Sequence, residues 1–410
     1  MLGLILSSVR GILVVTLDFN PNFVYISIVI IMILVSYFGY LSKKFYSTKD
    51  FILLRNILKF NLIFGIVNIF IDLFLGVTPY YGIIYLFIAP YIVFIFLQVS
   101  YRYLHVSVAI ITCLISYSVL GNFLDSISGA EGLQKIHDYN LALRPDSFQS
   151  LGRTGQYFRP SGYTGSYHDS ANILGMAVVY FFSRLILKRR IVDFLIFVFA
   201  MISLLLTQSA ANIIITIGVL IIFSIYMFIK LKGILNFKLI VALSLCTYLL
   251  WYEYSEYLGV FIDRINYAGA WDGMMTLPDN NQQDSFIFTR LLATIFGHAV
   301  IFEIEDIFTE IGFYGTILQL GIFHAVIFFS VMLFPLWKFI KHKAVCFEAI
   351  QPLAAVMFGF ISLLHYGSVT RVTSVFLFYA FFSMCVESLT RYEGSRKNQL
   401  QNFIDTKGKC

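Results

Sequence analysis

The fold is decided by the stretch R-P-S-G-Y-T-G-S-Y-H-D-S-A-N-I-L-G-M-A-V-V-Y-F-F-S-R-L-I-L-K-R-R, residues 159–190. It begins with a polar, glycine-containing segment, continues through an apolar run near 169–187, and ends in Lys188, Arg189 and Arg190. The apolar run is long enough to cross a bilayer as a helix, which takes roughly 20 residues. The stretch therefore predicts a transmembrane helix with a basic end on one side and a polar approach on the other.

Apolar runs of similar length recur along the chain. It has 410 residues, of which 59% are hydrophobic and 13% are charged, whereas a soluble domain carries about a quarter charged residues. The runs do not alternate with polar residues as the strands of a membrane barrel do. We therefore predict an all-α, polytopic integral membrane protein, a single transmembrane domain over 1–410 with about 12 transmembrane helices. These spans are placed near 2–19, 23–41, 57–77, 80–100, 104–121, 169–187, 191–207, 210–229, 238–252, 308–336, 347–366 and 372–390.

Lysine and arginine separate the two faces of this domain. Most of the 29 basic residues fall in one set of short loops, and the positive-inside rule makes that face cytoplasmic, with both termini on it. The opposite face has two long loops, near 122–168 and 253–307. Loops longer than about 15 residues are usually functional or disordered, so we expect the chemistry on this outer face. The net charge of +6 reflects the basic loops and does not indicate a nucleic-acid partner.

The first outer loop ends in S-Y-H-D, residues 166–169, directly before the apolar run. Ser166 followed by Asp169 is a variant of the capping box and predicts a helix start. A helix start also presents free N–H groups and the positive end of the helix dipole, which suit a phosphate. The capping role explains Ser166 and Asp169, but it explains neither His168 nor Arg159.

Arginine outnumbers lysine on the outer face. Its planar fork matches the oxygens of phosphate and carboxylate groups. Each arginine alone has an alternative reading as the partner of an outer acid, such as Asp146, Asp263 or Asp284. As a set we favour an anion site, with the candidates Arg153, Arg159, Arg264 and Arg290.

The second outer loop leads into F-G-H-A-V-I-F-E-I-E-D-I-F-T-E-I-G-F-Y-G, residues 296–315. Acids in a first helical turn are favoured by the helix dipole, so Glu305 and Asp306 have one interpretation as residues that stabilise a helix start. The alternative interpretation is that they take part in catalysis. His298 is either a general base or an ordinary interfacial histidine.

Other polar residues are expected to have structural roles. The turn L-T-Q-S-A-A-N, residues 206–212, is expected to satisfy helix ends, and His324 is expected to be a packed, hydrogen-bonded residue. No zinc motif, nucleotide-binding fingerprint or Asp-x-Asp pair stands out in the sequence, so neither a metal nor a cofactor is expected.

Together these motifs resemble the bacterial O-antigen polymerase (Wzy-type) and O-antigen ligase superfamily. The likeness rests on R-P-S-G-Y-T-G-S-Y-H-D-S-A-N (159–172) before a span, T-Q-S (207–209) in the following outer turn, and E-D-I-F-T-E-I-G-F-Y-G (305–315) opening a later span. The layout of spans and outer loops extends it over the whole chain. His298 is followed by Ala299, where ligases usually carry asparagine, which favours polymerase over ligase.

The resemblance implies a glycosyltransferase of the bacterial inner (plasma) membrane in lipopolysaccharide and polysaccharide biosynthesis. It would join oligosaccharide repeat units at the periplasmic face, with undecaprenyl diphosphate as donor carrier and leaving group. The alternatives are an O-antigen ligase and a lipid-linked oligosaccharide flippase or transporter. Implied partners are undecaprenyl-diphosphate-linked glycans and membrane lipids, with a chain-length regulator and a flippase as further candidates.

The expected roles follow from the charge that such a transfer develops. Departure of the diphosphate builds negative charge, which the four outer arginines would stabilise. His168 or His298 would take the proton of the acceptor hydroxyl, and Glu305 or Asp306 would orient that base or bind sugar hydroxyls. Aromatic rings that stack on sugars also form interfacial belts, and both readings stay open for the tyrosines of the loop. The expected sugar-binding residues are Tyr163, Tyr167 and Asn172.

Overall fold

A computed structural model of the chain describes residues 49–74, 86–128, 160–207, 209–231, 295, 313, 316–317, 320–341, 347–364 and 372–407. These residues form helices and short connections, and no strand occurs among them. The elements are α4 (Lys49–Phe74), η2 (Ala89–Ile92), α6 (Val93–Phe96), α7 (Tyr101–Ser128), η3 (Gly162–Thr164), α10 (Tyr167–Lys188), α11 (Ile191–Leu206), α12 (Ala210–Leu231), α16 (Ile322–Lys341), α17 (Phe347–Ile361), η7 (Ser362–Leu364) and α18 (Val372–Lys407).

Four described helices are long and apolar enough to cross a membrane: Asp50–Ile71, Tyr101–Leu124, Tyr167–Lys188 and Ile322–Lys341. The all-α prediction is thus confirmed for the described part of the chain, and its architecture is consistent with a helical membrane protein. The predicted spans near 2–19, 23–41 and 238–252 lie outside the described residues.

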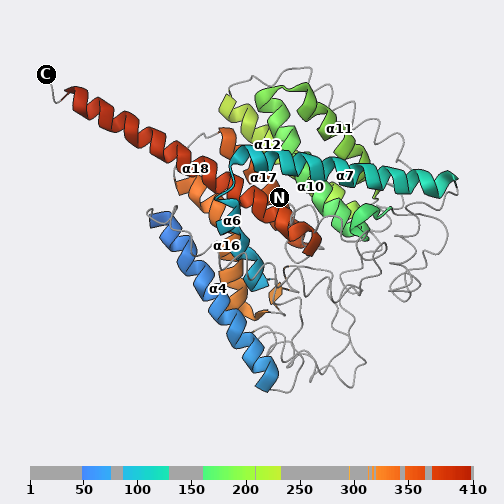
Figure 1. Cartoon of the computed structure of the whole chain (residues 1–410), viewed down its shortest axis with the longest axis horizontal. Helices are drawn as coiled ribbons and strands as arrows, with labels where there is room; N and C mark the ends of the chain where they lie inside the picture. The colour runs from blue at the N-terminus through green and yellow to red at the C-terminus, as the bar shows by residue number, and fades with distance from the viewer. Residues whose placement is uncertain are drawn as a thin grey trace.

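Helix α10 is the centre of the described bundle. It packs against α11, α17, α12 and α7 (Figure 1), and every residue from Asp169 to Arg184 is buried. Gly175 permits a close approach of α17, because a Cβ at this position would lie 2.3 Å from the ring of Phe358. Among the four described candidate spans, α10 is therefore the most enclosed, with 83% of its apolar window buried.

Two predicted spans are interrupted. The run near 80–100 contains η2, where Pro90 lacks an N–H group and leaves the carbonyl of Leu86 without its helical donor. Asn61 of α4 replaces that donor, with Nδ2 3.2 Å from the Leu86 oxygen. The run near 308–336 breaks at Gly321, whose φ of 73° is left-handed, and α16 begins only after it. Freed backbone groups inside a membrane are tolerated where such partners exist.

The break at Gly321 adjoins a buried polar group centred on His324. His324 Nε2 lies 3.0 Å from Asn61 Oδ1, and Nδ1 lies 3.2 Å from Asn68 Nδ2. Asn68 Nδ2 also donates to the Leu320 carbonyl at 2.9 Å. These bonds join α4 to α16, and they confirm that His324 is a packed, hydrogen-bonded residue.

Candidate functional site

The polar segment before α10 folds into a tight turn against the end of α7. Gly162 has a φ of +57°, and a Cβ there would lie 2.5 Å from Ser118 Oγ and 3.0 Å from Val119 Cγ2. Gly165 has a φ of 75° and ends η3. Left-handed backbone favours glycine because it carries no Cβ. The two glycines therefore serve a turn that seats residues 160–166 on α7.

Hydrogen bonds to α7 and α10 hold this turn in place. Ser161 N donates to Asn122 Oδ1 on α7 at 3.1 Å, and Tyr163 N donates to Ser118 Oγ at 3.0 Å. On the α10 side, Ser170 Oγ donates to the Ser161 carbonyl at 2.6 Å, while Thr164 Oγ1 lies 2.8 Å from Ser170 Oγ. Thr164 Oγ1 also lies 2.9 Å from the Ser161 carbonyl and 2.8 Å from the Ser166 carbonyl, so its one proton has three acceptors within reach.

Helix α10 begins where the capping-box pattern predicted, but a different hydroxyl supports it. Ser166 occupies the N-cap with extended backbone, and its side chain makes no capping hydrogen bond. Instead, Ser166 N donates to Thr164 Oγ1 at 3.2 Å, and the first helical bond runs from Ser170 N to the Ser166 carbonyl. The predicted position of the helix start is right, but Ser166 does not make the side-chain bond of a capping box.

Four predicted site residues lie on this turn and the first turns of α10. Tyr163, Tyr167 and His168 are half-buried, so each presents part of its ring at this end of the bundle. The rings of Tyr167 and His168 are in contact, with centroids 3.9 Å apart. Asn172 lies one helical turn beyond His168 on the same face of α10 and is fully buried. Burial raises the pKa of the Tyr163 phenol, so it remains a neutral hydrogen-bond donor.

The other predicted site residues lie outside the described residues. Arg159 directly precedes Pro160, the first described residue of this segment, so the chain leads from it straight into the turn. This group comprises the arginines Arg153, Arg159, Arg264 and Arg290 and the candidate catalytic residues His298, Glu305 and Asp306.

The turn between α11 and α12 has the structural role expected of it. Thr207 Oγ1 donates to the Leu204 carbonyl at 2.6 Å and accepts from Ser209 N at 3.4 Å. Asn212 Nδ2 donates to Ser209 Oγ at 3.0 Å. These bonds satisfy the end of one helix and the start of the next; Gln208 lies outside the described residues.

The turn and helix start can hold an anion next to two aromatic rings and an imidazole. The first N–H groups of a helix and its dipole attract negative charge. Aromatic faces bind the apolar faces of sugars, and an imidazole accepts a proton near neutral pH. No group of three or more His, Cys, Asp or Glu side chains able to hold a metal occurs within the described ranges.

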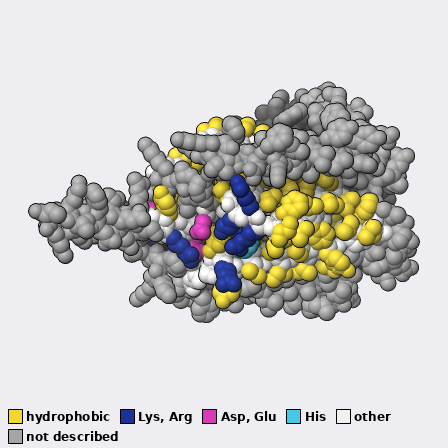
Figure 2. All heavy atoms as spheres, turned by 90° about the horizontal axis from the view of Figure 1, so that it is seen from above, with side chains coloured by type: hydrophobic (Ala, Val, Ile, Leu, Met, Phe, Trp, Pro, Cys, Tyr) yellow, Lys and Arg dark blue, Asp and Glu magenta, His cyan; other side chains and the backbone are white. Residues whose placement is uncertain are grey.

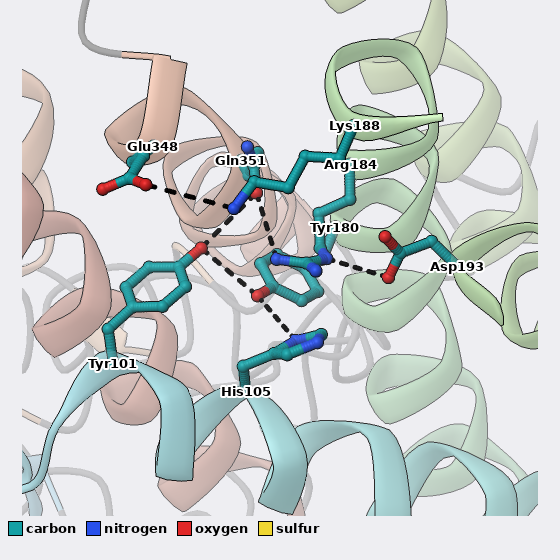
Figure 3. A network of polar contacts seen from close by, with 8 residues as sticks. All are labelled: Tyr101, His105, Tyr180, Arg184, Lys188, Asp193, Glu348 and Gln351. Carbon is teal, nitrogen blue, oxygen red and sulfur yellow. Dashed lines mark hydrogen bonds and ion pairs between the residues drawn. The ribbon is translucent and has the colours of Figure 1, made fainter. Parts of the chain in front are cut away.

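A second polar cluster, at the opposite end of the same helices, was not predicted (Figure 3). Arg184 Nε donates to Asp193 Oδ1 at 2.9 Å, and the two side chains are only 2 and 3% exposed. Arg184 Nη1 lies 3.4 Å from Gln351 Oε1, which also accepts from the Tyr101 hydroxyl at 3.4 Å. This cluster joins the start of α7, the end of α10 and the starts of α11 and α17.

The cluster extends through hydroxyl and imidazole groups. The Tyr180 hydroxyl lies 3.3 Å from that of Tyr101 and 3.1 Å from His105 Nδ1. Arg184 lies near the basic end of the span predicted over 169–187, where it counts with the cytoplasmic cations, and the structure buries it. The sequence could have predicted this pair, because Arg184 lies inside one predicted span and Asp193 lies just inside the next. Buried charges must be paired.

No protein-family model, curated protein or solved structure matches the chain.

Proposed function

We propose that the chain is a glycosyltransferase of the bacterial inner membrane that polymerises oligosaccharide repeat units carried on undecaprenyl diphosphate. The observation that supports this most is the turn that seats Gly162 on α7. It carries Tyr163 and leads into the start of α10, where the rings of Tyr167 and His168 are in contact. Such rigid support is what a site needs, because catalytic groups must keep their geometry without substrate.

The proposed reaction forms a C–O bond between the acceptor hydroxyl oxygen and the anomeric carbon of the donor sugar. The bond from that carbon to the diphosphate oxygen breaks, and the diphosphate takes the bonding electrons. His168, or alternatively His298, accepts the proton of the acceptor hydroxyl. Atoms and charges balance without a metal or another reactant.

The leaving diphosphate gains negative charge as the bond breaks. Arg159, which precedes the turn in sequence, and the positive end of the α10 dipole are suited to stabilise that charge, because preorganised positive charge acts most strongly where negative charge develops. The other outer arginines, Arg153, Arg264 and Arg290, would also bind the diphosphate. Glu305 or Asp306 would orient the base or bind sugar hydroxyls.

The periplasmic location of this end is part of the proposal. Lys188, Lys338 and Lys341 lie at the ends of their helices, and α10 begins at the end opposite Lys188. Basic residues concentrate on the cytoplasmic side of membrane proteins. The start of α10 would then face the periplasm, where a lipid-linked donor is presented.

A transporter of lipid-linked oligosaccharide is the second candidate, and buried charge inside the candidate spans favours it. Arg184 and Lys338 are both buried within such helices. Each lies within about one turn of its helix end, however, and each has an acid partner. Transporter sites are expected near the bilayer midplane, so we prefer the polymerase.

The test is to incubate the purified full-length protein with undecaprenyl-diphosphate-linked repeat units and to analyse the products by gel and mass spectrometry. A ladder of increasing chain length supports the proposal. Transfer of one glycan to a lipid A core acceptor would identify a ligase instead. Movement of the intact donor across vesicles without new glycosidic bonds would identify a transporter.

A further inference from the structure

The turn between α10 and α11 carries cations that the proposed reaction does not use. Lys188 ends α10, Arg189 is its C-cap, and Arg190 is the N-cap of α11. Arg189 and Arg190 are exposed, and Lys188 is partly exposed. We refer to Lys188, Arg189 and Arg190 as the basic turn.

Arg189 has an unusual backbone for a residue with a side chain. Its φ of 50° makes it the one residue other than glycine with positive φ among those described. Glycine or asparagine is usual at this position, because left-handed backbone crowds a Cβ. The capping bond, from Arg189 N to the Leu185 carbonyl at 3.0 Å, uses only the backbone. Glycine would serve the helix end equally well, so the arginine is explained by its side chain.

The basic turn has more positive than negative charge around it. Arg184 and Arg190 both repel Lys188 electrostatically. Asp193 forms its ion pair with Arg184, and the Glu348 Oε1 atom lies 4.0 Å from Lys188 Nζ. Within the described part of the chain, the side chains of Arg189 and Arg190 make no ion pair. An additional anion would therefore be attracted to this turn.

Apolar side chains follow the cations directly. Ile191, Val192 and Leu195 in the first turns of α11 are exposed. A space-filling view shows lysine and arginine side chains gathered beside a broad apolar surface (Figure 2). Exposed aliphatic groups at the end of a membrane helix contact acyl chains, while nearby cations reach the headgroups.

We propose that the basic turn binds the headgroup of an anionic phospholipid in the adjoining leaflet. The guanidinium groups of Arg189 and Arg190 hold the phosphate oxygens, Lys188 adds a point charge, and the acyl chains lie along Ile191, Val192 and Leu195. The apolar surface beside the cations indicates a lipid rather than a soluble phosphate. Because this site is at the end of α10 away from His168, it is independent of the proposed catalysis.

The test compares the full-length protein with the double variant Arg189→Gly and Arg190→Gln. Glycine suits the left-handed backbone, so the turn is expected to keep its fold. The thermal unfolding midpoint is measured in phosphatidylcholine nanodiscs with increasing phosphatidylglycerol, since a ligand of the folded state raises the midpoint. Arg102→Gln, which removes another exposed cation at this end of the bundle, is the matched control.

Phosphatidylglycerol is expected to raise the midpoint of the wild-type protein and also of Arg102→Gln, whose apparent lipid affinity is expected to fall at most about fivefold because it loses one surface cation. For the double variant the apparent lipid affinity is expected to fall about thirtyfold, because each basic residue near an anionic surface contributes roughly fivefold. An unchanged response in the double variant would overturn the proposal. So would an equal rise with soluble glycerol phosphate, or loss of the response in Arg102→Gln.

Discussion

Gly162 shows how one residue determines the geometry of the candidate site. Its left-handed backbone turns the chain, and its missing side chain lets the turn rest on Ser118 and Val119 of α7. Tyr163 follows immediately, and its own N–H is bonded to Ser118 Oγ. Any residue with a Cβ would push the turn off α7 and move Tyr163, Tyr167 and His168 with it.

Gly162→Ala is expected to lower stability by about 1–3 kcal/mol, because it adds both backbone strain and a clash with Ser118. Gly218→Ala in α12 is the matched control, since a Cβ there meets nothing within 4 Å. In a helix interior that change is expected to be neutral or to stabilise by about 0.5–1 kcal/mol. Thermal unfolding of the two purified variants makes the comparison. Equal melting temperatures would show that the turn does not need glycine.

His324 is held in one protonation state by its neighbours. Asn61 Nδ2 donates to the Leu86 carbonyl, so Asn61 Oδ1 accepts from His324 Nε2–H. Asn68 Nδ2 bonds the Leu320 carbonyl and donates to His324 Nδ1, which therefore carries no proton. The pattern fits the neutral ring with the proton on Nε2.

His324→Ala is expected to destabilise the protein by about 1–3 kcal/mol, because Asn61 and Asn68 each lose a buried partner. Polymerisation by the protein that remains folded in membranes is expected to continue, because His324 has a structural role. The checks are the melting temperature and the activity per folded molecule. Loss of activity at an unchanged melting temperature would assign His324 to catalysis instead.

At the scale of elements, the ends of α10 and α11 are joined by a buried ion pair. Arg184 and Asp193 flank the turn at 188–190 and bond at 2.9 Å. A buried pair adds little net stability relative to an apolar pair, but removing one partner leaves an uncompensated charge. The pair links the end of α10 to the start of α11, and Gln351 of α17 joins Arg184 to Tyr101 of α7.

Asp193→Asn is expected to lower stability by about 3–5 kcal/mol, since Arg184 would be left buried without a counter-charge. Glu348→Gln is the matched control, because the Lys188–Glu348 pair is 30 and 62% exposed and such pairs contribute about 0–1 kcal/mol. The amount of folded protein in membranes and its melting temperature distinguish the two variants. A loss in Glu348→Gln as large as that in Asp193→Asn would contradict this account.

Sequence patterns locate the helices far better than their interruptions and partners. The apolar runs of the sequence predict the ends of α10, α11 and α12 to within two residues, because the length of an apolar run is a strong signal for a membrane helix. The break at Gly321 and the turn at Pro90 were missed, since both lie inside continuous apolar runs. The continuation of α18 to Lys407 was missed as well, because apolar length says nothing about a polar helix beyond the membrane.

Only the parts of the candidate site that depend on neighbouring residues in the sequence could be predicted. The helix start at Ser166 follows from the order of residues, whereas its support by Thr164 and Ser170 depends on how the turn folds back. Partners remote in sequence, such as Ser118 and Asn122 for the turn, leave no periodic signal. Buried polar pairs of this kind become visible only when helices are packed.

At the scale of the whole molecule, the two ends of the bundle have different proposed tasks. The end where α10 begins carries the glycine turn and the aromatic and imidazole side chains proposed for glycosyl transfer. The end where α10 finishes carries the Arg184–Asp193 pair and the basic turn proposed for lipid binding. Because α10 connects them and is enclosed by its neighbours, it holds both ends in a fixed relation.

The central claim is that the end where α10 begins transfers glycosyl groups, and its most direct measurement is polymer formation by purified variants on lipid-linked repeat units. Arg159→Ala is expected to slow chain growth about 100–1000-fold through lost stabilisation of the diphosphate, and His168→Ala by at least about 100-fold if it is the base. Arg102→Ala, an exposed cation at the opposite end, is expected to polymerise at the wild-type rate. Full-length polymer made at that rate by Arg159→Ala would contradict the account.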